Sequence, residues 1–290
     1  MVFARSHLDL CIPVAIFGSD ANKSGETDMK IRKVKNYHEM SVAGADIIYN
    51  AAVAVLKCGG NFNLGLATGN TMIELYQILA DRFNADGIDL SRLQTWNLDE
   101  YAADEHHAVG HDHPLSYWKY MHEKLFRKFA PARNFRENQA HFPDPSDPAK
   151  FDRELEAAGG LDLQLLGIGF NGHIAFNEPV KESEISVEAY GKLPTRVLPL
   201  TQETIDQNTK VTANGDSSLV PHFAATTGMK PILAARQELL LACFAEQEAP
   251  LTKMLKNNRA TPELPASYLL EHPDFTLIYT ADKINLDAVL

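Results

Sequence analysis

The segment Gly167–Pro179, which reads GIGFNGHIAFNEP, holds the residues best suited to proton transfer. His173 supplies an imidazole, and Glu178 supplies a carboxylate able to orient it. Three glycines in the same segment allow a close approach of the backbone. A single histidine is more often structural, but this one follows a short apolar run within a glycine-rich segment. We therefore expect His173 and Glu178 to act in catalysis.

Two adjacent carboxylates, Asp99 and Glu100, follow a second apolar run that contains Trp96 and Leu98. Apolar neighbours raise the pKa of a carboxyl group toward the value that suits a general base. The alternative is a solvated loop or a helix N-cap, which is the more common explanation for two acidic residues taken alone. Asp99 remains a candidate base because it stands at the end of a predicted strand.

A candidate anion site lies at Thr68, Gly69, Asn70 and Thr71, which lead from a predicted strand into a predicted helix. Free backbone N–H groups and the helix dipole favour a phosphate at such a place. The segment lacks both the GxGxxG spacing and the lysine of a Walker motif. An ordinary turn with a threonine as N-cap is therefore the alternative.

The elements that position these residues alternate between short apolar runs and helical patterns. The predicted strands are 61–67, 93–98, 161–167, 239–244 and 275–279, and the predicted helices include 40–55, 72–83, 116–126 and 247–255. This alternation predicts an α/β fold with a largely parallel sheet covered on both faces. Ligands bind such sheets at the carboxyl ends of the strands, where the candidate residues lie.

The domain organisation follows from the same pattern and from the length. We predict one domain over residues 29–290, preceded by an N-terminal extension over residues 1–28, which carry no clear periodicity. Residues 131–150, rich in proline, are expected to form a loop, and residues 180–222 a long polar excursion.

Composition narrows the classes of partner. The chain has 290 residues, with 27 Lys and Arg against 38 Asp and Glu, so its formal net charge is −11. This balance argues against a nucleic acid or an anionic membrane as partner. Three scattered cysteines without CxxC spacing indicate neither a disulfide framework nor a zinc site. No apolar run approaches the length of a membrane span, so we expect a cytoplasmic protein.

Several runs together resemble the glucosamine-6-phosphate deaminase (isomerase) family. They are LGLATGNT at 64–71, NLDEY at 97–101, HPLSY at 113–117, GIGFNGHIAFNEP at 167–179, TTGM at 226–229 and TPELPASYLLEHP at 261–273. The resemblance implies a single Rossmann-like α/β domain. It also implies conversion of glucosamine 6-phosphate and water to fructose 6-phosphate and ammonia, without a metal or organic cofactor. A homo-oligomer is left open.

The resemblance also implies roles for individual residues. Asp99 matches the base that moves a proton between C2 and C1, His173 the imidazole that opens the sugar ring, and Glu178 the carboxylate that supports it. Asn171 stands where some members carry Asp and completes the predicted catalytic set. The predicted substrate-binding residues are Thr68, Gly69, Asn70, Thr71 and Lys210.

The chain departs from the family in the phosphate site. Lys210 stands where members carry Arg, and Glu248 lies in the segment Ala245–Glu248, where members carry Lys. Either Glu248 turns outward and the loop at 68–71, with Lys210 or Lys230, holds the phosphate, or the natural ligand is not a 6-phosphate sugar. We favour the first, because the loop is retained.

Three other functions stay open at this point. A galactosamine-6-phosphate deaminase is suggested by the run Gly228–Lys230. A 6-phosphogluconolactonase would share the fold, but Asn177 and Glu178 after the histidine argue against it. A non-catalytic sugar-phosphate sensor is disfavoured by Asp99, His173 and Glu178, and Glu248 keeps it in consideration.

Overall fold

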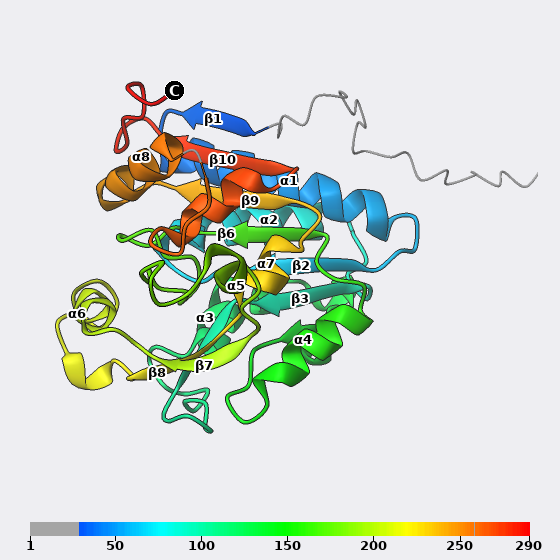
Figure 1. Ribbon diagram of the computed structural model, residues 1–290. Coiled ribbons are helices and arrows are strands. Elements are labelled where there is room, and N and C mark those ends of the chain that lie inside the picture. Colours follow the sequence, from blue (N-terminus) through cyan, green and yellow to red (C-terminus); the bar gives the residue numbers. More distant parts are fainter. Residues whose placement is uncertain (1–28, 258) are drawn as a thin grey trace, which may run out of the picture.

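A seven-stranded parallel sheet forms the centre of the molecule (Figure 1). The computed structural model describes residues 29–257 and 259–290, so the extension predicted at 1–28 lies outside the described residues. The strands, in their order across the sheet, are β1 (Lys30–Val34), β10 (Phe275–Thr280), β9 (Glu238–Ala242), β6 (Leu163–Leu166), β2 (Phe62–Leu66), β3 (Leu93–Asn97) and β5 (Ala140–His141). The expected α/β fold with a largely parallel sheet is confirmed.

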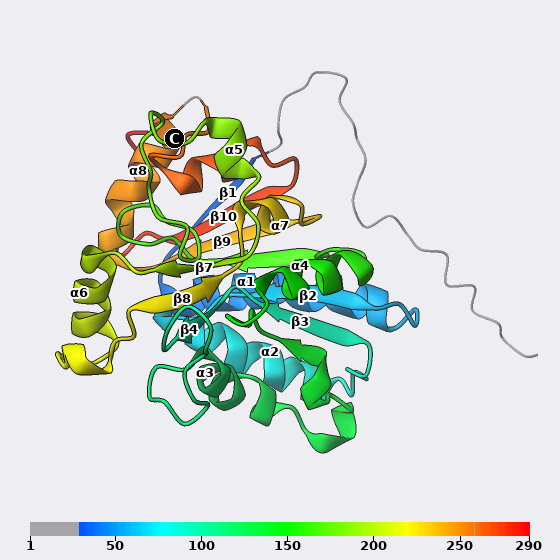
Figure 2. The ribbon, with the colours of Figure 1, turned by 60° about the horizontal axis from the view of Figure 1, so that its bottom comes forward.

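The central strands form where they do because both of their faces are buried. All residues of β2, β6, β9 and β10 are buried, which explains their near-continuous apolar sequences. On one face lie α1 (Tyr37–Leu56) and α2 (Ile73–Ala85), which pack against each other, and on the other face lie α4 (Pro148–Ala157) and α7 (Met229–Leu233) (Figures 1 and 2).

The remaining helices lie in the connections between strands. They are α3 (Tyr117–Lys124), α5 (Val187–Gly191), α6 (Gln202–Val211) and α8 (Glu248–Lys256), together with the short 3₁₀ segments η1 (Asn70–Met72), η2 (Phe126–Lys128), η3 (Pro131–Arg133), η4 (Glu137–Gln139), η5 (Ser217–Leu219), η6 (Ala245–Gln247) and η7 (Pro265–Glu271). The region 131–150, expected as a loop, thus contains η3, η4, β5 and the start of α4. Each of these elements is short, so its periodicity is weak.

A second, antiparallel sheet was not expected from the sequence. It consists of β4 (Asp99–Ala102), β8 (Phe223–Thr226) and β7 (Arg196–Pro199), in that order. The region 180–222, interpreted as a polar excursion, therefore contains β7 as well as α5 and α6. Each strand has four residues, and its partners lie far away in the sequence, so no local pattern announces the sheet. This sheet carries Asp99.

Helix α1 satisfies the length and hydropathy expected of a membrane span, with a mean hydropathy of 1.3. Its fully buried side chains include Met40, Ile48 and Ala52, which belong to the same hydrophobic cluster as the central strands. The helix also contacts β2, β9 and β10. We conclude that α1 is apolar because it packs in the hydrophobic core against the central sheet.

Candidate active site

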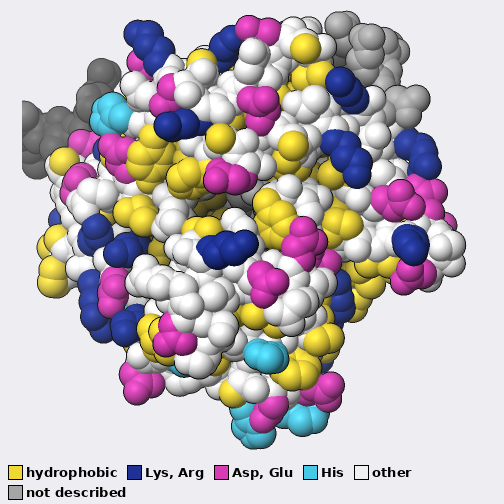
Figure 3. Space-filling model, turned by 90° about the vertical axis from the view of Figure 1, so that its left-hand side faces the viewer, with side chains coloured by type: hydrophobic (Ala, Val, Ile, Leu, Met, Phe, Trp, Pro, Cys, Tyr) yellow, Lys and Arg dark blue, Asp and Glu magenta, His cyan; other side chains and the backbone are white. Residues whose placement is uncertain are grey.

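The candidate residues meet at the carboxyl ends of the central strands. The chain leaves β2 for β3 on one side, whereas β6, on the other side of β2, leads to β9. Crevices form at such reversals of strand order. The loops after β2, β3 and β6 all open there, and Figure 3 shows this face, where hydrophobic side chains and side chains of both charges surround a hollow.

Asp99 opens β4, two residues after the end of β3. The residue is 8% exposed, and its carboxylate accepts a hydrogen bond from Thr226 Oγ1 on the neighbouring strand β8. Burial raises the pKa of Asp99 to about 7, against the opposing effects of the Thr226 hydrogen bond and of the charge of His173. A carboxylate with this pKa can take up and release a proton near neutral pH.

His173 lies in a tight turn that follows β6. The N–H of Gly172 donates to the carbonyl of Gly169, and the N–H of Gly169 donates to the carbonyl of His173 itself. The imidazole occupies the space beside Gly169, where a Cβ atom would lie 2.1 Å from Nε2. Any larger residue at 169 would therefore displace the ring. Nδ1 of His173 lies 3.5 Å from Oε2 of Glu178.

Glu178 is held by groups from two segments. Asn171 Nδ2 donates to its Oε2 at 2.7 Å, and Thr204 Oγ1 on α6 donates to Oε1. Burial acts to raise the pKa of Glu178, but its interactions with His173, Thr204 and Asn171 outweigh burial and lower it. Glu178 is thus an ionised carboxylate that faces His173. The side chain of Asn171 also accepts a hydrogen bond from the backbone N–H of His173.

The loop at 68–71 lies at the end of β2, beside the same crevice. Gly69 has φ of +129°, a conformation that side chains other than glycine rarely adopt, and it precedes η1, which runs into α2. Gly69 and Asn70 are exposed, whereas Thr71 is buried. The helix expected to begin at residue 72 thus begins with a 3₁₀ turn at Asn70. The loop presents backbone groups to the crevice.

Lys210 and Glu248 differ from the other predicted residues in their surroundings. Lys210 is exposed in the last turn of α6, about 200° around the helix from Asn208, whose amide donates to Tyr101. The structure therefore does not bring Lys210 into the cluster around Asp99. Glu248 begins α8, and its carboxylate accepts a hydrogen bond of 2.7 Å from the backbone N–H of Asn285.

Arg196 was not among the site residues predicted from the sequence. Its Nη1 donates to Asn177 Oδ1 at 2.8 Å, and it pairs across the small sheet with Thr226, which in turn pairs with Asp99. The three side chains form a row on one face of that sheet. Burial lowers the pKa of Arg196, and the charges of Tyr190 and Asp99 oppose this effect. A cation at the start of a short strand-like run, Arg196–Pro199, is the signal that could have indicated it.

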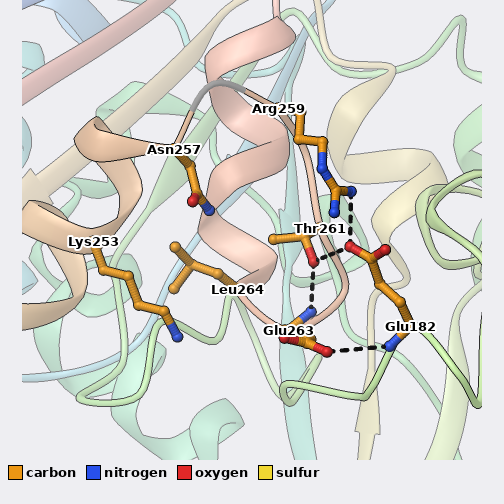
Figure 4. Close-up of a pocket in the computed structure, with 7 residues that line it drawn as sticks. All are labelled: Glu182, Lys253, Asn257, Arg259, Thr261, Glu263 and Leu264. Carbon is orange, nitrogen blue, oxygen red and sulfur yellow. Dashed lines mark hydrogen bonds and ion pairs between the residues drawn. The ribbon is translucent and has the colours of Figure 1, made fainter.

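A separate cavity of about 300 Å³ opens beside this region (Figure 4). It is lined by Glu182, Lys253, Asn257, Arg259, Thr261, Glu263 and Leu264. Arg259 forms an ion pair of 2.7 Å with Glu182, which also accepts a hydrogen bond from Thr261. None of the predicted site residues lines this cavity. Over the described part of the chain, no group of three His, Cys, Asp or Glu side chains is arranged to hold a metal ion.

Comparison with known proteins identifies the relatives of this chain. The sequence profile of glucosamine-6-phosphate isomerases/6-phosphogluconolactonase matches residues 35–181. The glucosamine-6-phosphate deaminase of Lysinibacillus sphaericus is 35% identical over 257 residues, which cover 87% of this chain and 98% of the relative. That of Clostridium acetobutylicum is 38% identical over 253 residues, with 86% and 96% covered.

The chain belongs to the glucosamine-6-phosphate isomerase/6-phosphogluconolactonase family. The expected family is thus confirmed. Among solved structures of this family, a monomeric glucosamine-6-phosphate deaminase superposes with a TM-score of 0.76 at 29% identity, and covers 89% of this chain and 100% of its own. The 6-phosphogluconolactonase of Thermotoga maritima superposes with a TM-score of 0.62 at 20% identity, over 87% and 99% of the two chains. The likeness to the lactonase shows the fold alone.

Proposed function

We propose that this chain is a glucosamine-6-phosphate deaminase that converts glucosamine 6-phosphate and water to fructose 6-phosphate and ammonia. The observation that carries the proposal is the buried Asp99, with a pKa of about 7, beside the His173–Glu178 pair. Aldose–ketose isomerisation needs one such group to carry a proton between two neighbouring carbons. The curated relatives at 35% and 38% identity bear the name of this activity.

In the proposed mechanism, the His173–Glu178 pair opens the ring. The imidazole moves a proton between O1 and O5 of the cyclic sugar, and the carboxylate of Glu178 stabilises the imidazolium that forms. Asn171 keeps Glu178 in place. His173 therefore needs a partner that stays ionised, which agrees with the lowered pKa of Glu178.

Asp99 then takes the proton from C2 of the open-chain sugar and returns it to C1. The enolamine formed between these steps becomes the imine at C2, and water replaces nitrogen there to give fructose 6-phosphate and ammonia. The ionised form of Asp99 starts the step, and its raised pKa allows it to hold the proton until C1 accepts it. The Thr226 hydroxyl fixes the carboxylate for both transfers.

The phosphate is proposed to bind at Thr68–Thr71. The backbone N–H groups of Asn70 and Thr71 at the start of η1, which donate to no acceptor among the described residues, support an anion there. Lys210 stays a proposed ligand: α6 borders the site through Thr204, and a lysine at its end has a long flexible stem. The hydrogen bond of Glu248 to Asn285 occupies its carboxylate, which supports the interpretation that Glu248 does not enter the phosphate site.

The alternative functions are supported to different degrees. A lactonase is not favoured, since the lactonase structure shares 20% identity whereas the deaminases named above share 35% and 38%. A sensor would not need the proton-transfer groups that surround Asp99. Three points rest on the sequence alone and remain proposals. They are the alternative of a galactosamine substrate, a homo-oligomeric state and a cytoplasmic location.

Ammonia release from a panel of sugars tests the proposal. The panel is glucosamine 6-phosphate, galactosamine 6-phosphate, glucosamine and 6-phosphogluconolactone, with fructose 6-phosphate measured as the second product. We expect equal amounts of ammonia and fructose 6-phosphate from the first sugar. Hydrolysis of the lactone without ammonia release from any amino sugar would overturn the proposal, and better use of the galactosamine epimer would redefine the substrate.

A further inference from the structure

Two tyrosine hydroxyls converge on the loop at 68–71 from different helices. Tyr37, the first residue of α1, donates to the carbonyl of Asn70 at 3.0 Å, and Tyr120, in α3, donates to the carbonyl of Gly69 at 2.7 Å. The Tyr37 hydroxyl also accepts a hydrogen bond of 3.1 Å from the N–H of Glu74, so its own proton remains directed at Asn70. Consecutive peptide groups of the loop are therefore each held by one tyrosine.

The direction of a carbonyl determines the direction of the following N–H. In a trans peptide the two groups point to opposite sides of the bond. Since the Gly69 carbonyl points to Tyr120, the N–H of Asn70 points away from that ring; since the Asn70 carbonyl points to Tyr37, the N–H of Thr71 points away from Tyr37. Neither N–H has a hydrogen-bond acceptor among the described residues. Both are thus donors available to a ligand.

The local backbone does not fix these directions by itself. Gly69 is the residue with the widest choice of backbone conformations, and a Cβ atom added to it would meet nothing within 4 Å. No side chain at residue 69 therefore restricts the backbone of the loop. One internal hydrogen bond, from the N–H of Met72 to the Gly69 carbonyl, restrains the turn. The hydrogen bonds from Tyr37 and Tyr120 further restrict the orientation of the peptide groups on either side of Asn70.

Helix α3, which carries Tyr120, packs against β4, the strand that carries the candidate base Asp99. Glu100, the neighbour of Asp99 in β4, is buried and accepts four hydrogen bonds. The donors are the N–H groups of Tyr101, Tyr117 and Trp118 and the hydroxyl of Ser116. Burial raises the pKa of Glu100, and the hydrogen bonds that it accepts oppose this rise. Because successive residues of a strand face opposite sides, Asp99 faces the crevice while Glu100 holds α3.

We propose that Tyr37 and Tyr120 are positioning residues that aim the N–H groups of Asn70 and Thr71 at the phosphate of the substrate, with Glu100 seating the helix of Tyr120. This inference rests on the proposed function and deepens it. The tyrosines do not touch the substrate; they act through the peptide groups of the loop. Their removal is expected to weaken the binding of phosphate and to leave proton transfer at Asp99 unchanged.

The test compares Tyr120→Phe and Tyr37→Phe with the parent. Each variant removes one hydroxyl and keeps the ring. We expect each to raise KM for glucosamine 6-phosphate, and Kd for inorganic phosphate measured by titration calorimetry, by about three- to ten-fold, which is the worth of one hydrogen bond. We expect kcat and its pH dependence to stay near the parent values. Tyr268→Phe is the matched control, because its hydroxyl also donates to a backbone carbonyl, that of Val187 at 2.8 Å.

The outcomes separate this inference from the proposed function. Unchanged KM and Kd in both variants, or an equal loss toward unphosphorylated glucosamine, would overturn the positioning role and leave the deaminase proposal intact. If the parent releases no ammonia, the deaminase proposal fails, and the Kd values for inorganic phosphate still decide the inference; no phosphate binding by the parent would overturn it. Circular dichroism establishes that each variant is folded, and Tyr37→Phe decides the matter if Tyr120→Phe does not fold.

Discussion

The two halves of the crevice are built from different kinds of groups. On the acid–base half, Asp99 is buried and His173 and Glu178 are partly buried, with Thr226 and Asn171 as partners to the two carboxylates. On the phosphate half, the proposed donors are backbone N–H groups near Gly69, Lys210 is exposed on α6, and Glu248 stands in the segment where the family resemblance implies a lysine. Proton transfer needs fixed side chains with shifted pKa values, whereas an anion can be held by peptide groups that any sequence supplies. The first half therefore tolerates less change than the second.

The largest effect is expected at Asp99, on the acid–base half. Asp99→Asn keeps the size of the side chain and an oxygen for Thr226, but removes the base, so kcat for ammonia release should fall by about a thousand-fold while KM changes little. Asp81→Asn, on the exposed surface of α2, is the control. A loss that appears mainly in KM would instead make Asp99 a binding residue.

Asp99→Asn is also expected to change how the free energy of unfolding depends on pH. Burial raises the pKa of Asp99 from 3.8 to about 7, so between these pH values the folded state holds a proton that the unfolded state has released. The stability contributed by this proton is present at low pH and is lost as pH rises through 7. Asp99→Asn should therefore gain stability relative to the parent, by about 3 kcal/mol between pH 5 and pH 8 in urea unfolding. A difference that stays constant with pH would contradict the buried, raised pKa.

His173→Gln tests the ring-opening half of the mechanism. We expect a loss of about a hundred-fold in kcat/KM for the cyclic substrate and a much smaller loss for an open-chain analogue, which does not need the step. His107→Gln is the matched control, because His107 also faces a carboxylate, that of Asp104, but on the exposed surface. Equal losses on the two substrates would assign His173 a structural role.

The smallest effect is expected on the phosphate half, at Glu248. Glu248→Lys changes a side chain that the hydrogen bond to Asn285 holds away from the proposed phosphate site, so KM for glucosamine 6-phosphate should change by less than about two-fold, with no change for unphosphorylated glucosamine. Glu246→Lys, two residues earlier and exposed, controls for the change in net charge. Equal or better use of the unphosphorylated sugar by the parent would show that the phosphate half has lost its role.

Much of the fold and the acid–base half could be predicted from the sequence, and the reasons differ from residue to residue. Strands such as β9 and β10 are short apolar runs, and the loops that follow β3 and β6 carry the chemical groups in contiguous motifs. Arg196 left only a weak signal in the sequence and Thr204 left none, because β7 pairs with a strand far away in the sequence and α6 reaches Glu178 from another segment.

The phosphate half was the harder part to predict. The loop at Thr68–Thr71 is visible as a motif, but its peptide directions depend on Tyr37 and Tyr120, which lie on other helices. The surroundings of Lys210 depend on the face of α6 that Asn208 turns toward Tyr101. Such contacts join distant segments and leave no local pattern.

Hydrogen exchange at C2 tests the central claim most directly. Glucosamine 6-phosphate is incubated in D₂O with the parent and with Asp99→Asn, and the loss of the C2 proton signal is followed by NMR together with the appearance of fructose 6-phosphate. If Asp99 carries the proton between C2 and C1, the parent removes the C2 proton and forms fructose 6-phosphate that carries at C1 either that proton or a deuteron exchanged from solvent, and the variant leaves the C2 proton in place over the same time. Removal of the C2 proton by the variant at a rate near that of the parent would contradict the assignment of Asp99 as the base.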